Sequence, residues 1–176
     1  MKLLLHVCCG PCATSSIKRV IKDYDVICYF YNPCIEPEEE YFKRLKEFVK
    51  VCEFLKVDYV IGDYDNDEFR SLVKGREGDV EGGERCLICY EQRLGKVVKY
   101  AKENGFDLFT TTLTISPHKR SVDIFEIGKK VSEKFEVEFL EIDFKKKDGF
   151  NESVEMSEEM NLYRQNYCGC EFSKNI

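Results

Sequence analysis

Three cysteines stand directly after an almost continuously apolar segment near the start of the chain, and this junction limits the possible folds more than any other feature. Residues 3–7 (LLLHV) lack the alternation of a half-exposed strand, so they predict a central parallel strand that is covered on both faces. Cys8, Cys9 and Cys12 follow at its carboxyl end. In open α/β sheets ligands bind at that edge, where the strand order reverses. The sequence therefore predicts a metal centre built on this turn.

Strand-like and helix-like segments alternate along the rest of the chain. Strands are predicted at residues 3–7, 26–31, 58–61, 106–112 and 136–142, and helices at about 14–23, 37–55, 68–73, 86–105, 121–134 and 153–160. This alternation predicts a parallel sheet with helices on both faces. We expect one α/β domain, residues 1–176, with a three-layer α/β/α arrangement and about five mostly parallel strands. Residues 75–84 contain four glycines, which predicts a mobile connector over an opening. Residues 163–170 are predicted to form an irregular tail.

The net charge, the short first apolar segment and the number of cysteines limit the possible classes of function. The net charge of −6 argues against nucleic-acid binding through the overall field, so any polyanion must contact a local basic patch. The first apolar segment is too short for a signal peptide or a membrane span, so we expect a cytoplasmic protein without a membrane partner. Ten cysteines in that compartment predict metal binding or redox catalysis. The Lys- and Glu-rich composition resembles that of proteins from hot environments, which keeps disulfides as an alternative.

Seven of the cysteines occur at short spacings at or beyond the ends of predicted elements. They are Cys8, Cys9, Cys12, Cys86, Cys89, Cys168 and Cys170. Cys28 and Cys52 fall on a strand and on an apolar helix face, where small buried hydrophobic residues are expected. Cys34 is ambiguous. Seven thiols exceed the four that a four-iron cluster or a structural zinc takes, so the remainder can hold a second metal.

Local geometry refines these assignments. If Cys8 and Cys9 are both extended, their side chains point to opposite sides, and we expect them to serve different metal atoms. Cys86 and Cys89 share one face at a helix start, where the thiolate form is favoured. Gly169 lets the backbone curl so that its two cysteine neighbours face inward.

Other polar residues have simpler readings. The Gly10-Pro11 turn lacks both phosphate-loop patterns, which argues against a nucleotide site there. His6 is expected to be a satisfied core histidine. His118 is either a proton donor or part of a solvated loop. The run Lys145–Lys147 is either a solvated turn or a phosphate contact.

Six segments in this order resemble the QueH family of epoxyqueuosine reductases. They are CCGPC (8–12), YNP (31–33), ERCLICYEQRL (84–94), TTLTISPHK (111–119), DFKKKDG (143–149) and YRQNYCGC (163–170). Together they cover the chain from Leu3 to about Ser173. Cys34 departs from the family pattern, where a polar residue such as Asn is expected, so Cys34 is not assigned as a ligand.

The resemblance implies a Rossmann-like fold related to the adenine-nucleotide alpha hydrolases (HUP-like), with CCGPC in place of the phosphate loop. It also implies a 4Fe-4S cluster with an additional mononuclear iron. The implied reaction removes the epoxide oxygen of epoxyqueuosine at the wobble position of a tRNA anticodon, which requires two electrons from an unidentified low-potential donor.

Roles for individual residues follow from that reaction. Asp143 is the candidate metal ligand or proton donor, with Tyr90 and Tyr163 as further donors. Cations expected on tRNA phosphates are Arg93, Lys119, Lys146 and Arg164. Two other classes compete with this interpretation: a zinc-stabilised nucleic-acid-binding domain without redox activity, and a thiol oxidoreductase that uses the C-x-x-C pairs.

Overall fold

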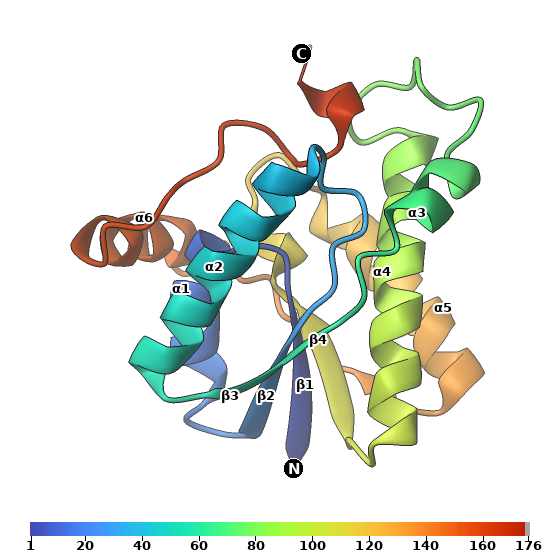
Figure 1. Ribbon diagram of the computed structural model, residues 1–176. Helices are drawn as coiled ribbons and strands as arrows, with labels where there is room; N and C mark the ends of the chain where they lie inside the picture. The colour runs from blue at the N-terminus through green and yellow to red at the C-terminus, as the bar shows by residue number, and fades with distance from the viewer. Residues whose placement is uncertain (175–176) are drawn as a thin grey trace.

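The computed structural model describes residues 1–174, which form a five-stranded sheet between two layers of helices (Figure 1). All pairings are parallel and the strand order is β3-β2-β1-β4-β5. The strands are β1 (Lys2–Val7), β2 (Asp25–Phe30), β3 (Asp58–Ile61), β4 (Leu108–Thr111) and β5 (Glu138–Phe139). Leu5 of β1 is in register with Cys28 of β2 on one side and with Thr110 of β4 on the other.

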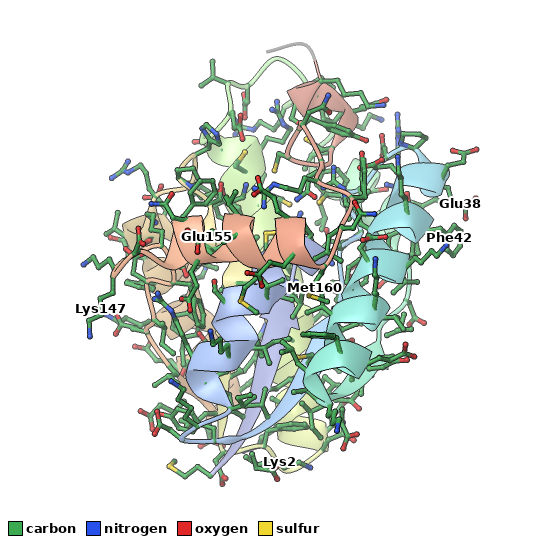
Figure 2. The ribbon with its side chains drawn as sticks, turned by 90° about the vertical axis from the view of Figure 1, so that its left-hand side faces the viewer. Lys2, Glu38, Phe42, Lys147, Glu155 and Met160 are labelled. Atoms are coloured by element: carbon green, nitrogen blue, oxygen red, sulfur yellow. A yellow bond between two sulfur atoms is a disulfide. The ribbon has the colours of Figure 1, made fainter. Side chains whose placement is uncertain are left out.

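Helices cover both faces of the sheet. They are α1 (Gly10–Val20), α2 (Glu38–Leu55), α3 (Asn66–Leu72), α4 (Glu84–Glu103), α5 (Ser121–Phe135) and α6 (Gly149–Glu159), with short 3-10 turns η1 (Thr112–Ile115) and η2 (Glu171–Ser173). Helices α1 and α2 pack on one face, and α4 and α5 on the other (Figure 1). Helix α6 lies across α1 (Figure 2). No helix of residues 1–174 is both long and apolar enough to cross a bilayer.

The apolar run of β1 is explained by its central position. Leu3, Leu5 and Val7 belong to the core beneath α1 and α2, whereas Leu4 belongs to the core beneath α4. All four side chains are fully buried. Alternate residues of one strand therefore complete two separate cores, which is why the segment shows no polar alternation.

The strand order places a crevice at the carboxyl end of β1. The chain leaves β1 toward β2 on one side of the sheet and later returns to β4 on the other, so the order reverses between β1 and β4. Ligands bind outside such a switch point in open α/β sheets. The tail that follows α6 crosses this edge and ends beside the loop between α3 and α4 (Figure 1).

The predicted element order is confirmed, and several element ends differ from expectation: α6 begins at Gly149 instead of Ser153, and β4 covers Leu108–Thr111 of the predicted 106–112. Helix α1 begins at Gly10 instead of Thr14, because Cys9 caps it: the Cys12 N–H donates to Cys9 Sγ over 3.2 Å, and Pro11 suits the first turn. The last strand covers only Glu138–Phe139 of the predicted 136–142. Beyond it the carbonyls of Leu140 and Ile142 accept hydrogen bonds from threonine hydroxyls instead of a strand ladder.

Candidate metal centre

A cavity of about 530 Å³ opens at the switch point, and we call it the thiol cavity. Its walls come from the turn after β1, from residues 113–119 after β4, from residues 164–168 of the tail, and from single side chains of α2 and α4. Three of the seven assigned cysteines line it directly: Cys8, Cys12 and Cys168. Two of the three cysteine groups that the sequence places at this edge therefore line one space, whereas Cys86 and Cys89 are not among its lining residues.

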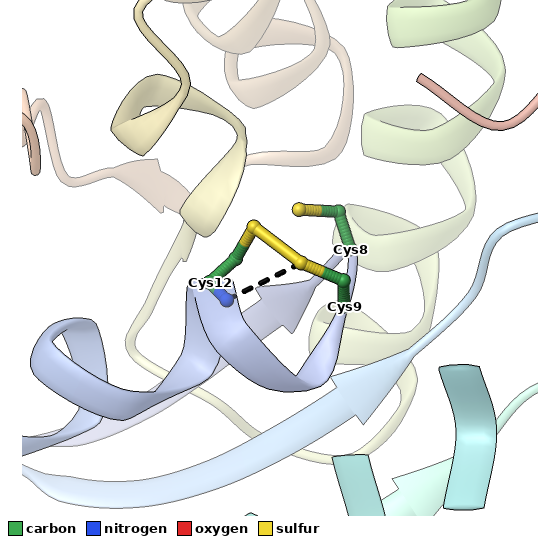
Figure 3. A group of neighbouring side chains, drawn as sticks. All are labelled: Cys8, Cys9 and Cys12. Atoms are coloured by element: carbon green, nitrogen blue, oxygen red, sulfur yellow. Dashed lines mark hydrogen bonds between the residues drawn. A yellow bond between two sulfur atoms is a disulfide. The ribbon is translucent and has the colours of Figure 1, made fainter. Parts of the chain in front are cut away.

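The first three cysteines form one compact group (Figure 3). The sulfur atoms of Cys8, Cys9 and Cys12 all lie within 4.8 Å of one another. Those of Cys9 and Cys12 are joined as a disulfide. Thr112 ties this turn to η1, because its hydroxyl accepts from the Cys8 N–H (3.1 Å) and donates to Cys8 Sγ (3.4 Å). Metal ions bind deprotonated thiols, so reduction of the disulfide has to precede metal binding here.

This grouping corrects the expectation that Cys8 and Cys9 face opposite sides. That expectation assumed a straight extended backbone through both residues. The chain instead bends at Cys8, directly after β1 ends at Val7, and α1 starts directly after Cys9. The alternation of a strand therefore does not apply, and the two sulfurs are near enough to bind one metal atom.

Helix α4 and the tail contribute the other four thiols. Cys86 and Cys89 lie in the first turns of α4, and Cys86 Sγ accepts from the Gly82 N–H over 3.3 Å. Burial, and then the charge of Cys168, raise the pKa of Cys86. The pKa of Cys170 is also raised, first by burial and then by the charges of Cys34 and Cys168. The four cysteines are therefore close enough to interact electrostatically around Cys168.

Cys34, which the sequence left unassigned, lies inside this group. It follows β2, is only 1% exposed, and its sulfur accepts from the guanidinium of Arg93. The hydrogen bond from Cys89, and then the charge of Arg93, lower the pKa of Cys34 against the effect of burial. The same pairing with Cys34 raises the pKa of Cys89.

The tail is held over the cavity by Arg44, another residue that the sequence did not single out. Arg44 is 2% exposed and pairs with Glu40 one turn earlier in α2 (2.8 Å). Its other nitrogens donate to the carbonyls of Cys168 (2.8 Å) and Tyr167 (3.1 Å). Gly169 has φ +143°, so it provides the curl that the sequence predicted. The sequence did contain one signal for Arg44: it follows Glu40 by four residues on an apolar helix face, a spacing that allows an ion pair.

The expected phosphate cations occupy three different environments. Lys119 lines the cavity, and its ammonium donates to Cys168 Sγ over 3.2 Å. Arg93 also lines the cavity but is buried. Arg164 lies at the cavity rim and is exposed. Lys146 is exposed and is not among the cavity-lining residues; its carbonyl accepts from Arg19 over 2.8 Å.

The candidate proton donors lie behind the cavity wall or at its edge. Asp143 does not line the cavity, and its carboxylate pairs with Lys145 at 3.2 Å. Tyr90 is buried beside the site, and burial raises its pKa. The Tyr163 hydroxyl donates to Glu40 at about 3.0 Å. His118 lines the cavity from an exposed position.

His6 is the core histidine that the sequence predicted. Its Nε2 donates to the Tyr31 carbonyl (2.9 Å), so Nδ1 accepts from the Thr111 hydroxyl (2.8 Å). Burial lowers its pKa to about 3, and the ring is therefore neutral. With both nitrogens engaged, His6 is a structural residue behind the cysteine turn.

The connector between α3 and α4 forms turns without helix or strand, as expected. Arg85 fixes it, because this buried side chain donates to the carbonyls of Arg76 (3.0 Å), Glu77 (3.2 Å) and Asp79 (2.5 Å). Glu81 is the connector residue that lines the cavity. The connector therefore borders the opening and is anchored from α4.

The donor set fits an iron-sulfur centre. Thiolates are the usual protein ligands of such clusters. The thiols come from three segments, and the cations Arg93 and Lys119 contact sulfur atoms directly. Cys28 and Cys52 are fully buried in the core beneath α1 and α2, as the sequence predicted for them.

Comparisons with known proteins agree with this site. The family described as "Epoxyqueuosine reductase QueH" matches residues 3–176. The QueH protein of Streptococcus pyogenes serotype M1 is 40% identical over 185 residues, covering 99% of this chain and 71% of that protein. Its counterpart in Thermotoga maritima is 38% identical over 174 residues, covering 97% and 89%.

A solved structure shows the same fold. The U34-tRNA thiolase NcsA from Methanococcus maripaludis, with its 4Fe-4S cluster, aligns with a TM-score of 0.60 and 16% identity. The alignment covers 98% of this chain and 61% of that chain. At this identity the likeness concerns the fold alone, and it confirms the predicted Rossmann-like α/β architecture. Taken with the family match and the relatives, the cysteine pattern establishes that the chain belongs to the QueH family of epoxyqueuosine reductases.

Proposed function

We propose that this protein reduces epoxyqueuosine at the wobble position of a tRNA anticodon to queuosine. The reaction takes two electrons and two protons, opens the epoxide to an alkene and releases its oxygen as water. The observation that carries the proposal is that thiols from two distant segments, the first turn and the tail, line one cavity at the ligand-binding edge of the sheet. Family membership supports the identity of the substrate.

The proposed cofactors are a 4Fe-4S cluster and an additional mononuclear iron. Their ligands come from Cys8, Cys9, Cys12, Cys86, Cys89, Cys168 and Cys170, with Asp143 as a further candidate. The 4Fe-4S cluster of NcsA, on a similar fold, supports the first of these cofactors. When bound, the cluster supplies single electrons and the lone iron acts as a Lewis acid toward the epoxide oxygen.

The chain's own residues provide binding and water exclusion. A cavity of about 530 Å³ is large enough for one nucleoside, so the base has to leave its stack to enter. Leu113, Ile115 and Pro117 give one wall an apolar surface that limits access of water. Arg164 at the rim is placed to contact a flanking phosphate. Tyr90 and Asp143 remain the proposed proton donors, with Lys145 holding the Asp143 carboxylate in place.

The partners follow from the chemistry. The substrate is a tRNA that carries epoxyqueuosine, and the electrons come from a low-potential donor of unidentified nature. We propose that the reaction takes place in the cytoplasm, where the cysteines are kept reduced.

Nucleoside analysis tests this function. Epoxyqueuosine-containing tRNA is incubated anaerobically with reconstituted protein and a chemical reductant, then digested and separated by chromatography. We expect queuosine to replace epoxyqueuosine with the wild-type chain and not with Cys89→Ser. Unchanged epoxyqueuosine in the presence of protein that carries a reducible cluster would contradict the proposal. A colourless protein loaded with zinc would favour the zinc-stabilised nucleic-acid-binding alternative.

A further inference from the structure

Among residues 1–174, three cations at the thiol cavity have no carboxylate partner: Arg164 is exposed at the rim, whereas Arg93 and Lys119 lie deeper in its walls. Arg93 on α4 is 3% exposed, and Lys119 lies on the loop that follows η1. The other buried arginines are satisfied differently: Arg44 pairs with Glu40, and Arg85 donates to three carbonyls. A buried cation without an anion is unfavourable, so Arg93 requires negative charge inside the cavity, and the partly buried Lys119 adds a second positive charge to the same space.

Both cations contact sulfur atoms. Lys119 Nζ donates to Cys168 Sγ over 3.2 Å. Arg93 Nη2 donates to Cys34 Sγ, while its Nε has no partner although it is buried. Cys8 and Cys168 line the same cavity as both cations.

The fold fixes each cation in its position. Arg93 follows Cys89 by four residues and Cys86 by seven, so the three side chains lie on one face of α4. On the opposite wall, Lys145 Nζ donates to the carbonyls of Thr114 (3.0 Å) and Lys119 (3.3 Å). This holds the loop that carries Lys119. The two positive groups flank the same space from different elements.

We propose that Arg93 and Lys119 are positioning residues that stabilise the reduced form of the iron-sulfur centre and raise its reduction potential. Lys119 acts through its hydrogen bond to Cys168 Sγ, an assigned ligand, and Arg93 acts through its charge and its unpartnered Nε in the cavity wall, since Cys34, which it contacts, is not an assigned ligand. Reduction adds negative charge to a cluster, so nearby N–H donors and positive charges stabilise the reduced form more than the oxidised form. This inference rests on the proposed function, because it requires the cluster. It gives Arg93 and Lys119 a role at sulfur atoms in place of the tRNA phosphates expected from the sequence.

A redox titration monitored by electron paramagnetic resonance tests the proposal. The variants are Lys119→Met, Arg93→Gln and their combination, each reconstituted anaerobically and checked for iron and sulfide content. We expect the midpoint potential to shift to more negative values in each single variant and further in the double variant. Lys119→Arg keeps a positively charged donor, so its midpoint potential is expected to stay close to that of the wild-type protein.

Lys96→Met is the matched control. Lys96 lies three residues after Arg93 on α4, but its ammonium pairs with Asp65 at 3.2 Å and it does not line the cavity. Its removal should leave the potential unchanged. If Arg93→Gln does not assemble a cluster, Lys119→Met decides the question, since Lys119 is on a loop and only partly buried.

The failures of the two proposals are distinguishable. Unchanged potentials in Lys119→Met and Arg93→Gln proteins with a full cluster would overturn this inference alone. A wild-type protein that assembles no iron-sulfur cluster under the same conditions would overturn the proposed function and this inference with it.

Discussion

The thiols of this chain differ in what surrounds them. Cys28 on β2 and Cys52 on α2 are fully buried in apolar core. Cys8, Cys12 and Cys168 line a cavity beside cationic side chains. Side chains of one chemical type therefore serve two purposes, and individual substitution separates them.

We expect Ser at Cys9, Cys86 or Cys89 to abolish or strongly reduce bound iron, because each removes a thiolate from the centre. Cys28→Ala and Cys52→Ala should retain iron and lose only about 1 kcal/mol of stability, the usual cost of a small core truncation. Iron analysis together with thermal unfolding measures both effects. Equal iron loss at all five positions would show that our division of the cysteines is wrong.

Residue spacing grouped the cysteines that are proposed as ligands, and the limits of that method have a physical cause. Short spacings identified cysteine groups because neighbours in sequence are neighbours in space. Cys34 contacts Arg93 across 59 positions, and no local pattern reports on such a pair. Arg93 was expected on phosphates because the implied substrate is a tRNA, and its burial beside Cys34 was not predicted. The one local signal was its spacing of four from Cys89 on a helix.

At the level of elements, the cysteine turn depends on the close approach of α1 to α2. A Cβ atom added at Gly10, the first residue of α1, would lie 2.8 Å from Glu47 Cβ and 2.9 Å from the Glu47 carbonyl carbon on α2. Backbone cannot move away as a flexible side chain can. Glycine at this position therefore sets the distance between the two helices and the placement of Cys9 and Cys12.

Gly10→Ala should destabilise the protein by about 1–3 kcal/mol, the usual cost of overpacking, and should lower iron occupancy. Gly95→Ala is the control, since a Cβ there meets nothing within 4 Å on α4. That change should stabilise the helix by about 0.4–1 kcal/mol. Denaturant unfolding measures both, and a Gly10→Ala protein as stable as wild type would contradict the packing argument.

The connector between α3 and α4 gives a second prediction about the elements of the fold. Arg85→Gln removes a charged donor from three connector carbonyls, so residues 75–83 should be cleaved by protease several-fold faster. Limited proteolysis with mass spectrometry locates the cleavage. Arg76→Gln, at an exposed connector side chain, should change the rate little. Equal rates in wild type and Arg85→Gln would show that Arg85 does not anchor the connector.

Element order was predictable, whereas some element ends were not. Apolar patterns marked most elements because the strands and the longer helices bury apolar side chains in one of two cores. The start of α1 depends on a cysteine sulfur acting as the cap, which is not a usual capping group. The last strand was shortened because threonine hydroxyls of the neighbouring segment took its hydrogen bonds. Both outcomes depend on single side chains.

For the whole molecule, the charge distribution limits how tRNA can bind. The net charge is −6, so attraction has to come from cations near the cavity mouth. Arg164→Glu should weaken tRNA binding and reduce its salt dependence by about one unit of slope. Lys102→Glu reverses a charge near the end of α4 that is far from its cysteines, and should have little effect. Equal affinities of the two variants for tRNA would contradict the placement of the phosphate contact.

The central claim is that the folded chain gathers its cysteines to hold an iron-sulfur centre. The most direct measurement is the iron and sulfide content, with the visible and electron paramagnetic resonance spectra, of wild-type protein purified without oxygen. We predict a brown protein with broad visible absorption that bleaches on reduction, and iron in excess of the four atoms of one cluster. A colourless protein that contains zinc and no sulfide would contradict the account.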